Sequence, residues 1–202
     1  MKTTRGKASS KTRKMALIGI FSAIASVLMF FELPMPFMPP FLKVDPSGVP
    51  ILLSSMLFGP TAAISVTLIK DVIHLLSTTT GGVGELADFL IMSSFSVVVG
   101  LIYSKRSDRK GVLMATLAGT VTIAVVGGLA NRFLLIPFFS KVMPLEAIFA
   151  ACAEINPAID GLNAYIFFGA VPFNVIKGLL LTVLTFLLYR KLEGFLKNYI
   201  KP

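Results

Sequence analysis

The sequence predicts an all-α integral membrane protein with six transmembrane helices and both termini in the cytoplasm. Three observations predict this fold class: the apolar composition, the lengths of the apolar stretches and the distribution of the basic residues. Hydrophobic residues make up 55% of the 202 residues, and the mean hydropathy is +0.83. A water-soluble domain of this size has nowhere to bury so much apolar surface, so lipid is the expected solvent.

Six apolar stretches account for most of the chain, and their lengths favour helices that cross a bilayer. A helix needs about 20 residues to cross about 30 Å of hydrocarbon. Four of the stretches reach or approach that length, the third is slightly short and the second is clearly short. The six stretches are residues 15–31, 47–58, 60–77, 86–104, 112–136 and 166–189. We expect residues 1–202 to form a single six-helix membrane domain.

The basic residues predict the orientation. Three basic clusters hold most of the 19 Lys and Arg residues. With six spans all three fall on one side of the membrane, which the positive-inside rule makes the cytoplasm, whereas five spans would divide them. The net charge of +9 then reflects topology and the lipid surface rather than nucleic-acid binding, because the clusters lie in tails and one loop. The clusters are Lys2, Arg5, Lys7, Lys11, Arg13 and Lys14; Lys105, Arg106, Arg109 and Lys110; and Arg190, Lys191, Lys197 and Lys201.

The first stretch follows a basic cytoplasmic tail, residues 1–14. A secretory signal with cleavage near Ala23-Ile24-Ala25 is an alternative, but the apolar run continues past that point to Phe31, which disfavours cleavage. Between the second and third stretches, Gly59-Pro60 predicts a tight turn, since Gly suits the end of a helix and Pro suits the first turn of the next.

Three connections are expected outside the cell. Residues 32–46 contain five prolines, which exclude a helix or a central strand. The segment is also apolar, so we expect it to pack down over a site as a capping loop. Residues 77–85 contain three glycines and predict a tight turn. The long loop 137–165 is expected to hold a short helix near 144–153, and loops of this length are commonly functional.

Ionisable and amide side chains within the apolar stretches gather in the outer half of the membrane. Polar groups in lipid are costly and mark functional sites by default. Asn174 and Lys177 are three residues apart, which places them on one helix face; Asn131 lies toward the outer end of the fifth stretch. Because the inner half has few such groups, the pattern indicates a pocket open to the outside. The outer group also includes Glu32, Lys43, Asp45, Lys70, Asp71, His74, Glu85, Asp88 and Arg132.

Several of these groups have structural interpretations. Lys70 and Asp71 can pair with other helices or reach the interface, and His74 suits a hydrogen bond between helices. Glu85 and Asp88 open the fourth stretch, where the helix dipole favours anions. A membrane-embedded enzyme that uses His74, Glu85 and Asp88, and a proton-coupled carrier with Lys70, Asp71 and His74 as its relay, remain alternatives.

The residue types narrow the chemistry. His74 and Cys152 are the only residues of their kinds, so a multi-histidine or thiolate metal site is not expected. No phosphate-binding loop of the type G-x-x-x-x-G-K-[ST] occurs in the sequence, so uphill transport would take its energy from another protein. Two Asn and one Lys match an edge that alternates carbonyl, N–H and carbonyl. A flat ligand with an imide-like edge fits such a site, with walls from Phe41, Phe138, Phe167 and Phe173.

Four segments carry a resemblance to a known family. They are residues 41–50, FLKVDPSGVP; 84–89, GELADF; 131–133, NRF; and 174–178, NVIKG. With the six spans, they resemble the riboflavin-specific S-components of energy-coupling-factor (ECF) vitamin transporters, over nearly the whole chain from Met15 to Arg190. In that family the flavin ring lies near the outer surface under the first loop.

The resemblance implies the site, the ligand and the partners. Asn131, Asn174 and Lys177 would meet the flavin ring of riboflavin or FMN, with Phe41 and Glu85 also in the site. Glu32, Lys43 and Asp45 would surround the ribityl chain or fix the loop. No cofactor is implied, only a transported ligand. The implied partners are a transmembrane coupling subunit and two cytoplasmic ATPases. Gly19 and Ala23 correspond to the family's small-residue docking pattern; packing within the same chain is the alternative.

Overall fold

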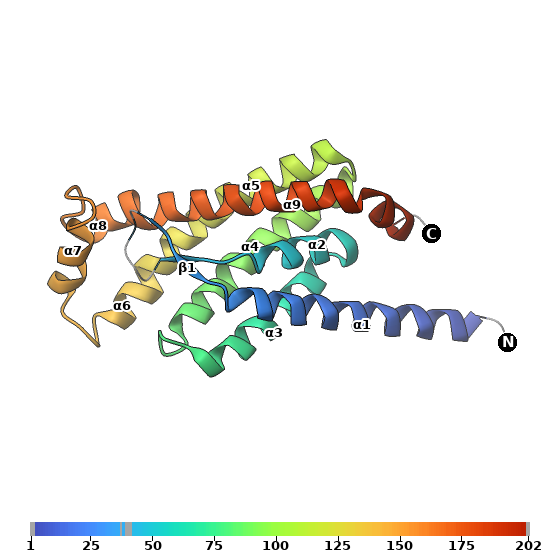
Figure 1. The fold of residues 1–202 in the computed structure, drawn as a ribbon, viewed down its shortest axis with the longest axis horizontal. Coiled ribbons are helices and arrows are strands. Elements are labelled where there is room, and N and C mark those ends of the chain that lie inside the picture. Colours follow the sequence, from blue (N-terminus) through green and yellow to red (C-terminus); the bar gives the residue numbers. More distant parts are fainter. Residues whose placement is uncertain (1–2, 37, 39–41, 201–202) are drawn as a thin grey trace.

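The computed structural model describes residues 3–36, 38 and 42–200, with side chains described for 11–36, 38 and 42–194. It is a bundle of helices with one two-stranded hairpin (Figure 1). The elements are α1 (Thr3–Met29), β1 (Leu33–Pro34), β2 (Lys43–Val44), α2 (Gly48–Phe58), α3 (Pro60–His74), η1 (Leu75–Ser77), α4 (Val83–Lys105), α5 (Arg109–Ala130), η2 (Asn131–Leu135), α6 (Ile136–Phe139), α7 (Leu145–Ala153), α8 (Leu162–Tyr165), η3 (Ile166–Ala170) and α9 (Val171–Ile200).

The helices confirm a membrane protein but not six full spans. Five helical segments are long and apolar enough to cross a bilayer: Lys11–Met29, Pro60–Ser77, Val83–Lys105, Arg109–Phe139 and Leu162–Gly194. The remaining apolar helix, α2, has 11 residues, or about 16 Å, roughly half the hydrocarbon thickness. Nine of its residues are buried. The structure therefore has five long helices and one half-length helix inside the bundle.

The second and third stretches meet as the sequence predicts. α2 ends at Phe58, Gly59 adopts a φ of 87°, and α3 begins at Pro60. Lys14 Nζ, in α1, donates to the Phe58 carbonyl oxygen at 3.0 Å. The basic start of the first stretch therefore lies beside the turn between α2 and α3, so α2 returns the chain to the end where α1 began.

The described residues of the three basic clusters lie at one end of the bundle, as expected. The start of α1 and the end of α9 are at that end (Figure 1). Arg109, at the start of α5, pairs with Glu193 of α9 at 2.7 Å. Asp108 caps α5 by accepting from the Gly111 N–H at 2.6 Å. Hydrogen bonds from the Arg106 guanidinium and from this N–H hold the pKa of Asp108 below its usual value.

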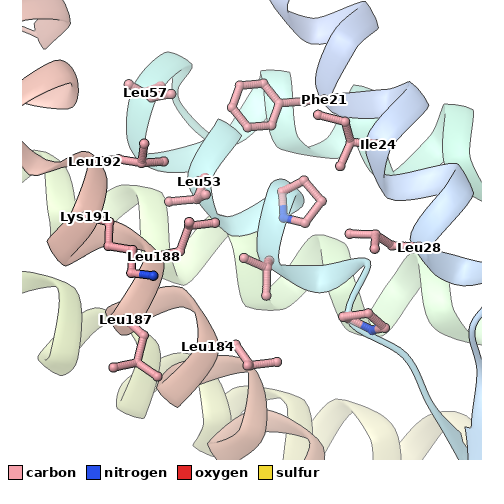
Figure 2. Close-up of a pocket in the computed structure, with 13 residues that line it drawn as sticks. Phe21, Ile24, Leu28, Leu53, Leu57, Leu184, Leu187, Leu188, Lys191 and Leu192 are labelled. Carbon is pink, nitrogen blue, oxygen red and sulfur yellow. The ribbon is translucent and has the colours of Figure 1, made fainter.

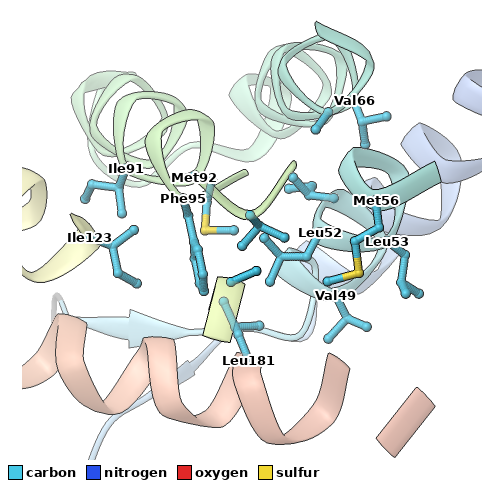
Figure 3. Packing of buried hydrophobic residues seen from close by; sticks show 14 of the residues in the cluster. Val49, Leu52, Leu53, Met56, Val66, Ile91, Met92, Phe95, Ile123 and Leu181 are labelled. Carbon is cyan, nitrogen blue, oxygen red and sulfur yellow. The ribbon is translucent and has the colours of Figure 1, made fainter. Parts of the chain in front are cut away.

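The core lies where α4 packs against α2, α3 and α5, and α5 against α9. Phe95 of α4 is fully buried, and Met92 and Leu52 pack nearby (Figure 3). Gly119 of α5 allows the close approach, since a Cβ there would lie 2.2 Å from the Phe95 ring. Small residues at helix contacts are typical of membrane bundles. The outward faces are apolar, with Leu76 90% exposed, which fits lipid as the surrounding solvent.

The end of the bundle opposite the basic clusters holds the described residues of the three predicted connections. The short helix expected near 144–153 is present as α7. Residues 78–82 form the turn before α4, where Gly81 and Gly82 have φ of 62° and 88°. The first loop forms a hairpin in which Leu33 pairs with Val44 and Pro34 with Lys43. It packs down as expected, because Met35 and Leu42 are buried against Phe173 of α9.

Candidate functional site

Two adjoining cavities lie between the first-loop hairpin, the start of α4, the η2 and α6 segment and α9. The smaller has a volume of about 110 Å³ and the larger about 410 Å³. They share a common wall formed by Lys43, Thr80, Gly84, Asp88, Phe139 and Lys177. We call these two cavities together the outer cleft, after the orientation that the sequence predicts. The smaller cavity adds Asn131, Phe173 and Asn174; the larger adds Glu32, Asp45, His74 and Glu85.

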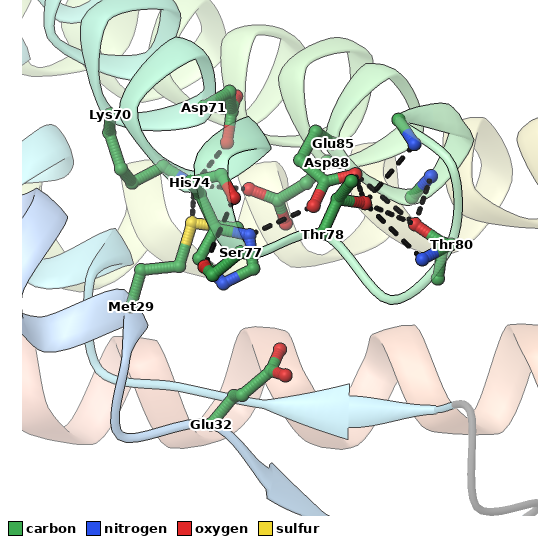
Figure 4. Close-up of polar contacts among 12 residues, drawn as sticks. Met29, Glu32, Lys70, Asp71, His74, Ser77, Thr78, Thr80, Glu85 and Asp88 are labelled. Atoms are coloured by element: carbon green, nitrogen blue, oxygen red, sulfur yellow. Dashed lines mark hydrogen bonds and ion pairs between the residues drawn. The ribbon is translucent and has the colours of Figure 1, made fainter.

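Four charged side chains form a chain of ion pairs beside the outer cleft. Asp88 of α4 accepts from Lys177 of α9 at 2.8 Å and from Lys70 of α3 at 2.6 Å. Lys70 also pairs with Asp71 at 2.6 Å and lies 3.2 Å from the sulfur of Met29 (Figure 4). The side chains of Lys70 and Lys177 are 0% and 8% exposed. Two cations therefore balance two anions in a desolvated setting, as buried charges require.

Asn131 uses more of its hydrogen-bonding groups within the protein than Asn174 does. Asn131 begins the π-helical turn η2; its Nδ2 donates to Gly127 O at 2.8 Å, and its Oδ1 accepts from the Tyr165 hydroxyl at 2.7 Å. Asn174 Nδ2 donates to Ala170 O at 2.8 Å, but its buried Oδ1 has no partner among the described residues. Buried polar atoms are seldom unpaired, so Asn174 offers a ligand an acceptor and a second N–H.

Close helix packing holds Asn174 in place. A Cβ on Gly127 of α5 would lie 2.3 Å from Asn174 Nδ2. The missing side chain at residue 127 therefore creates the space that the Asn174 amide occupies. This contact fixes an α9 side chain against the backbone of α5 and limits its rotamers, which pre-organises the amide for binding.

Glu85 lies at the centre of a hydrogen-bonded turn above the ion pairs. Its Oε1 lies 2.9 Å from His74 Nδ1, and its Oε2 accepts from Thr78 and Thr80 at 2.9 and 3.1 Å. The interpretation of His74 as an interhelical hydrogen-bond partner is confirmed. Glu85 lines the larger cavity, and its contacts also order the turn at 78–82, so this carboxylate shapes the cleft wall.

The hairpin supplies the upper wall. Lys43 forms an ion pair with Glu32, and Asp45 Oδ1 accepts from the Ser47 N–H at 2.8 Å, next to the start of α2. The side chains of Glu32, Lys43 and Asp45 line the larger cavity. Phe41, the other site residue expected from this loop, lies outside the described residues.

The aromatic expectations were partly wrong. Phe173 is buried and lines the smaller cavity, but Phe167 is 69% exposed and neither it nor Phe138 lines the cleft. Phe139 is the aromatic residue that lines both cavities. For Asp88 the sequence left open an anion in the first turn of a helix and an acid/base group; the structure pairs it with both Lys70 and Lys177. Its partners are 18 and 89 residues away in sequence, so no local pattern signals this role.

The small residues of α1 face outward. Gly19 and Ala23 are exposed, and a Cβ on Gly19 would meet no described atom within 4 Å. The alternative that they pack against another span of the same chain is therefore wrong for the part of the chain that the structure describes. Neither residue carries a bulky side chain, which allows another backbone to approach closely at these two positions.

The fold and the cleft together define a class of protein. A bundle of apolar helices with a polar, partly unsatisfied cleft at one end is a membrane protein that binds a small molecule; the described residues contain no group of three or more His, Cys, Asp or Glu arranged to hold a metal ion. The family model for the ECF transporter, substrate-specific component, matches residues 13–189. The chain belongs to this family, so it is a transport protein and not an enzyme.

Individual relatives agree with this assignment. The riboflavin transporter RibU of Staphylococcus aureus (strain TCH60) is 34% identical over 188 residues, which cover 93% of this chain and 94% of that protein. The riboflavin transporter FmnP of Bacillus subtilis (strain 168) is 28% identical over 191 residues, covering 93% and 96%. A solved structure titled "Structure and mechanism of the S component of a bacterial ECF transporter" matches with a TM-score of 0.68 and 34% identity, covering 93% of this chain and 99% of that one.

Proposed function

We propose that this chain captures riboflavin in the outer cleft and delivers it for import by an ECF complex. The observation that carries the proposal is the buried, unpaired Oδ1 of Asn174 in a cavity that also holds Asn131 and Lys177. The names of the relatives, riboflavin transporters that match 93% of the chain, support the choice of ligand. The ligand is cargo, and no cofactor is part of the proposal.

The polar edge of the flavin ring fits the smaller cavity. An imide presents one N–H between two carbonyl groups. In the proposed pose the N–H donates to Asn174 Oδ1, and the carbonyls accept from the Lys177 ammonium and from the remaining amide N–H groups. Asp88 holds Lys177 at 2.8 Å and so positions that ammonium before the ligand arrives. Phe173 and Phe139 provide apolar and aromatic surface for the ring.

The larger cavity suits a polyol better than a phosphate. Glu32, Asp45, Glu85 and Asp88 line it, and its two lysines, Lys43 and Lys177, are both paired with carboxylates. A ribityl chain can donate hydroxyl hydrogen bonds to these acceptors. A phosphate monoester would bring negative charge toward four carboxylates in a site of low dielectric constant. We therefore propose riboflavin, rather than FMN, as the preferred cargo.

The proposed orientation places the basic end of the bundle in the cytoplasm and the cleft toward the outside. The positive-inside rule supports it, because the described residues of the basic clusters share one end of the bundle with the start of α1 and the end of α9. In the proposed path the chain changes sides of the membrane six times. The second crossing is made by α2, which passes through only half of the hydrocarbon, together with the hairpin, which passes through the rest. The location is the cell membrane.

Energy for uptake must come from partners, and the exposed Gly19/Ala23 surface is the proposed docking site for a transmembrane coupling subunit that works with two cytoplasmic ATPases. Gly19→Leu should abolish uptake by cells that hold the whole complex, while riboflavin binding by the purified chain is unchanged. Ile20→Leu, at the adjacent exposed position, is the matched control and should leave both unchanged. Loss of binding in Gly19→Leu would mean that this residue is structural.

The binding proposal itself is tested by titrating the purified chain in detergent with riboflavin and following the fluorescence of the flavin. The chain has no Trp, so little protein emission interferes. We expect saturable binding of one riboflavin per chain and no turnover. A protein that binds no flavin, or that transports riboflavin alone in proton-loaded vesicles, would refute the proposal; the latter result would favour the proton-coupled carrier.

A further inference from the structure

Tyr165 places a buried hydroxyl next to the outer cleft without lining it. The side chain is 0% exposed, and Tyr165 lines neither of the two cavities. Its hydroxyl donates at 2.7 Å to Oδ1 of Asn131, which does line the smaller cavity. Tyr165 belongs to α8, at the end of the long connection 137–165. An element outside the cleft therefore reaches one of the amides inside it.

This hydrogen bond decides which group of Asn131 is available to a ligand. The Gly127 carbonyl oxygen can only accept, so the amide nitrogen must face it, and Nδ2 donates to it at 2.8 Å. Oδ1 is then turned to Tyr165. With its oxygen in that position, the amide offers the smaller cavity its second N–H, whose partner on a ligand must be an acceptor such as a carbonyl oxygen.

Asn174 has the same local anchor but no such hydroxyl. Each of the two amides donates from Nδ2, at 2.8 Å, to the carbonyl oxygen four residues earlier in its own helix. In the part of the chain that the structure describes, Asn174 Oδ1 has no partner, whereas Asn131 Oδ1 accepts from Tyr165. Two identical side chains thus become complementary: Asn131 offers a donor, and Asn174 keeps an acceptor. An imide edge, with a carbonyl next to an N–H, needs this combination.

Close packing holds the ring of Tyr165 in place. Ile148 and Cys152 of α7 belong to the same buried cluster as Tyr165, and the Phe149 ring centroid lies 6.5 Å from the Tyr165 ring centroid. A Cβ on Gly169 of η3 would lie 3.1 Å from Tyr165 Cδ2, so the glycine leaves room for the ring. The short helix α7 therefore supports the cleft through Tyr165, although neither α7 nor Tyr165 lines it.

We propose that Tyr165 is a positioning residue that makes Asn131 a donor and so selects a carbonyl group in the cargo. This role rests on the proposed function, because it requires the imide edge of a flavin to enter the smaller cavity. A single hydrogen bond does not fix a planar amide, since the terminal torsion of Asn has a broad energy minimum. The bonds to Gly127 and Tyr165 hold the amide together, which lowers the cost of ordering it when the ligand binds.

The role of the hydroxyl is tested by titrating the purified chain in detergent with riboflavin. Tyr165→Phe removes one oxygen atom and should raise the dissociation constant about fivefold, the effect of one hydrogen bond. In the Asn131→Ala background the same substitution should have no further effect, because the amide through which it acts is gone. Unchanged affinity in Tyr165→Phe, or an equal loss in both backgrounds, would overturn the proposal.

Two substitutions are matched controls and should leave the affinity unchanged. Tyr189→Phe removes a hydroxyl that is equally buried and lies 3.2 Å from the Tyr103 hydroxyl. Tyr189 lines neither the outer cleft nor the apolar groove of about 560 Å³ between α1, α2 and α9 (Figure 2). Asn163→Ala breaks another bond between α8 and η2, from Arg132 at 2.7 Å. A loss in either control as large as that in Tyr165→Phe would show that packing, not the hydroxyl, supports binding, and the proposal would be wrong.

The selection of a carbonyl is tested with 2-thioriboflavin and 4-thioriboflavin, in which sulfur, a weak acceptor, replaces one ring carbonyl oxygen. The wild-type chain should bind at least one of them more weakly than riboflavin, and Tyr165→Phe should reduce that penalty. Because two ligands are compared on one protein, this readout does not depend on the stability of the variant. Wild-type protein that binds both thioflavins as tightly as riboflavin, or penalties that Tyr165→Phe leaves unchanged, would contradict the role of Tyr165. A wild-type chain that binds no riboflavin refutes the proposed function instead.

Discussion

Asn174→Ala should separate flavin affinity from protein stability. In the ligand-free protein Asn174 Oδ1 has no partner among the described residues, so its removal breaks no bond at that atom. The only hydrogen bond among the described residues that the substitution loses is that from Nδ2 to the Ala170 carbonyl oxygen, worth about 1 kcal/mol, and Gly127 loses the amide that packs against it. The free energy of unfolding should therefore fall by about that amount or less, since an unpaired buried acceptor also disappears.

Riboflavin binding should weaken by at least as much. Loss of a buried partner for the ring N–H costs about 1–3 kcal/mol, which raises the dissociation constant about 5- to 150-fold. Titration by flavin fluorescence measures this change, and thermal melting without riboflavin measures stability. Asn163→Ala is the matched control, because Asn163 is exposed and contacts Arg132. A variant at Asn174 that keeps wild-type affinity would refute the assigned contact.

The remaining predictions concern the ion pairs, the cargo and the topology. Lys177→Met should lower the free energy of unfolding by about 3–5 kcal/mol, because it leaves the buried Asp88 with one cation fewer, and it should also lower the affinity for riboflavin. An unchanged melting temperature would contradict the ion-pair network. FMN should bind more weakly than riboflavin in a competition titration. High salt should reduce this difference in affinity only slightly, because buried charges are poorly screened. Equal affinities would contradict the proposal that the carboxylates of the larger cavity disfavour a phosphate. For topology, Ser140→Cys should react with a membrane-impermeant maleimide in intact cells and Ser107→Cys only after permeabilisation. The native Cys152 should give no background, since it is buried and burial raises the pKa of its thiol to about 11; labelling of Ser107→Cys in intact cells would reverse the orientation.

Much of the fold follows from local sequence signals. The long apolar stretches, the Gly59-Pro60 turn and the helix at 145–153 each depend on residues that are adjacent in sequence, and the structure confirms them. The half-length of α2 was visible as a short stretch, but its burial inside the bundle was not. Whether a short apolar segment crosses the membrane or sits in the interior depends on the helices around it, which local hydropathy does not describe.

The site was predictable by residue type but not by geometry. Seven of the eight expected ligand-site residues line the outer cleft. The cost of polar groups in lipid pointed to Asn131, Asn174 and Lys177, and the family resemblance assigned all eight to the site. Phe138 was expected in the loop 137–165, but the helical structure continues through the π-helical turn at Asn131–Leu135 into α6, and Phe139 is the residue that lines the cleft. A similar turn at Ile166–Ala170 contains Phe167. Neither turn has a reliable sequence signature.

The central claim, that the imide edge of a flavin meets Asn174, is tested most directly by a ligand that lacks the imide hydrogen. Riboflavin methylated at the ring N3 should bind the wild-type protein more weakly than riboflavin. In Asn174→Ala the two flavins should bind with nearly the same affinity, because the partner of that hydrogen is gone. An equal penalty for methylation in both proteins would show that the N–H contacts something else and would contradict the account.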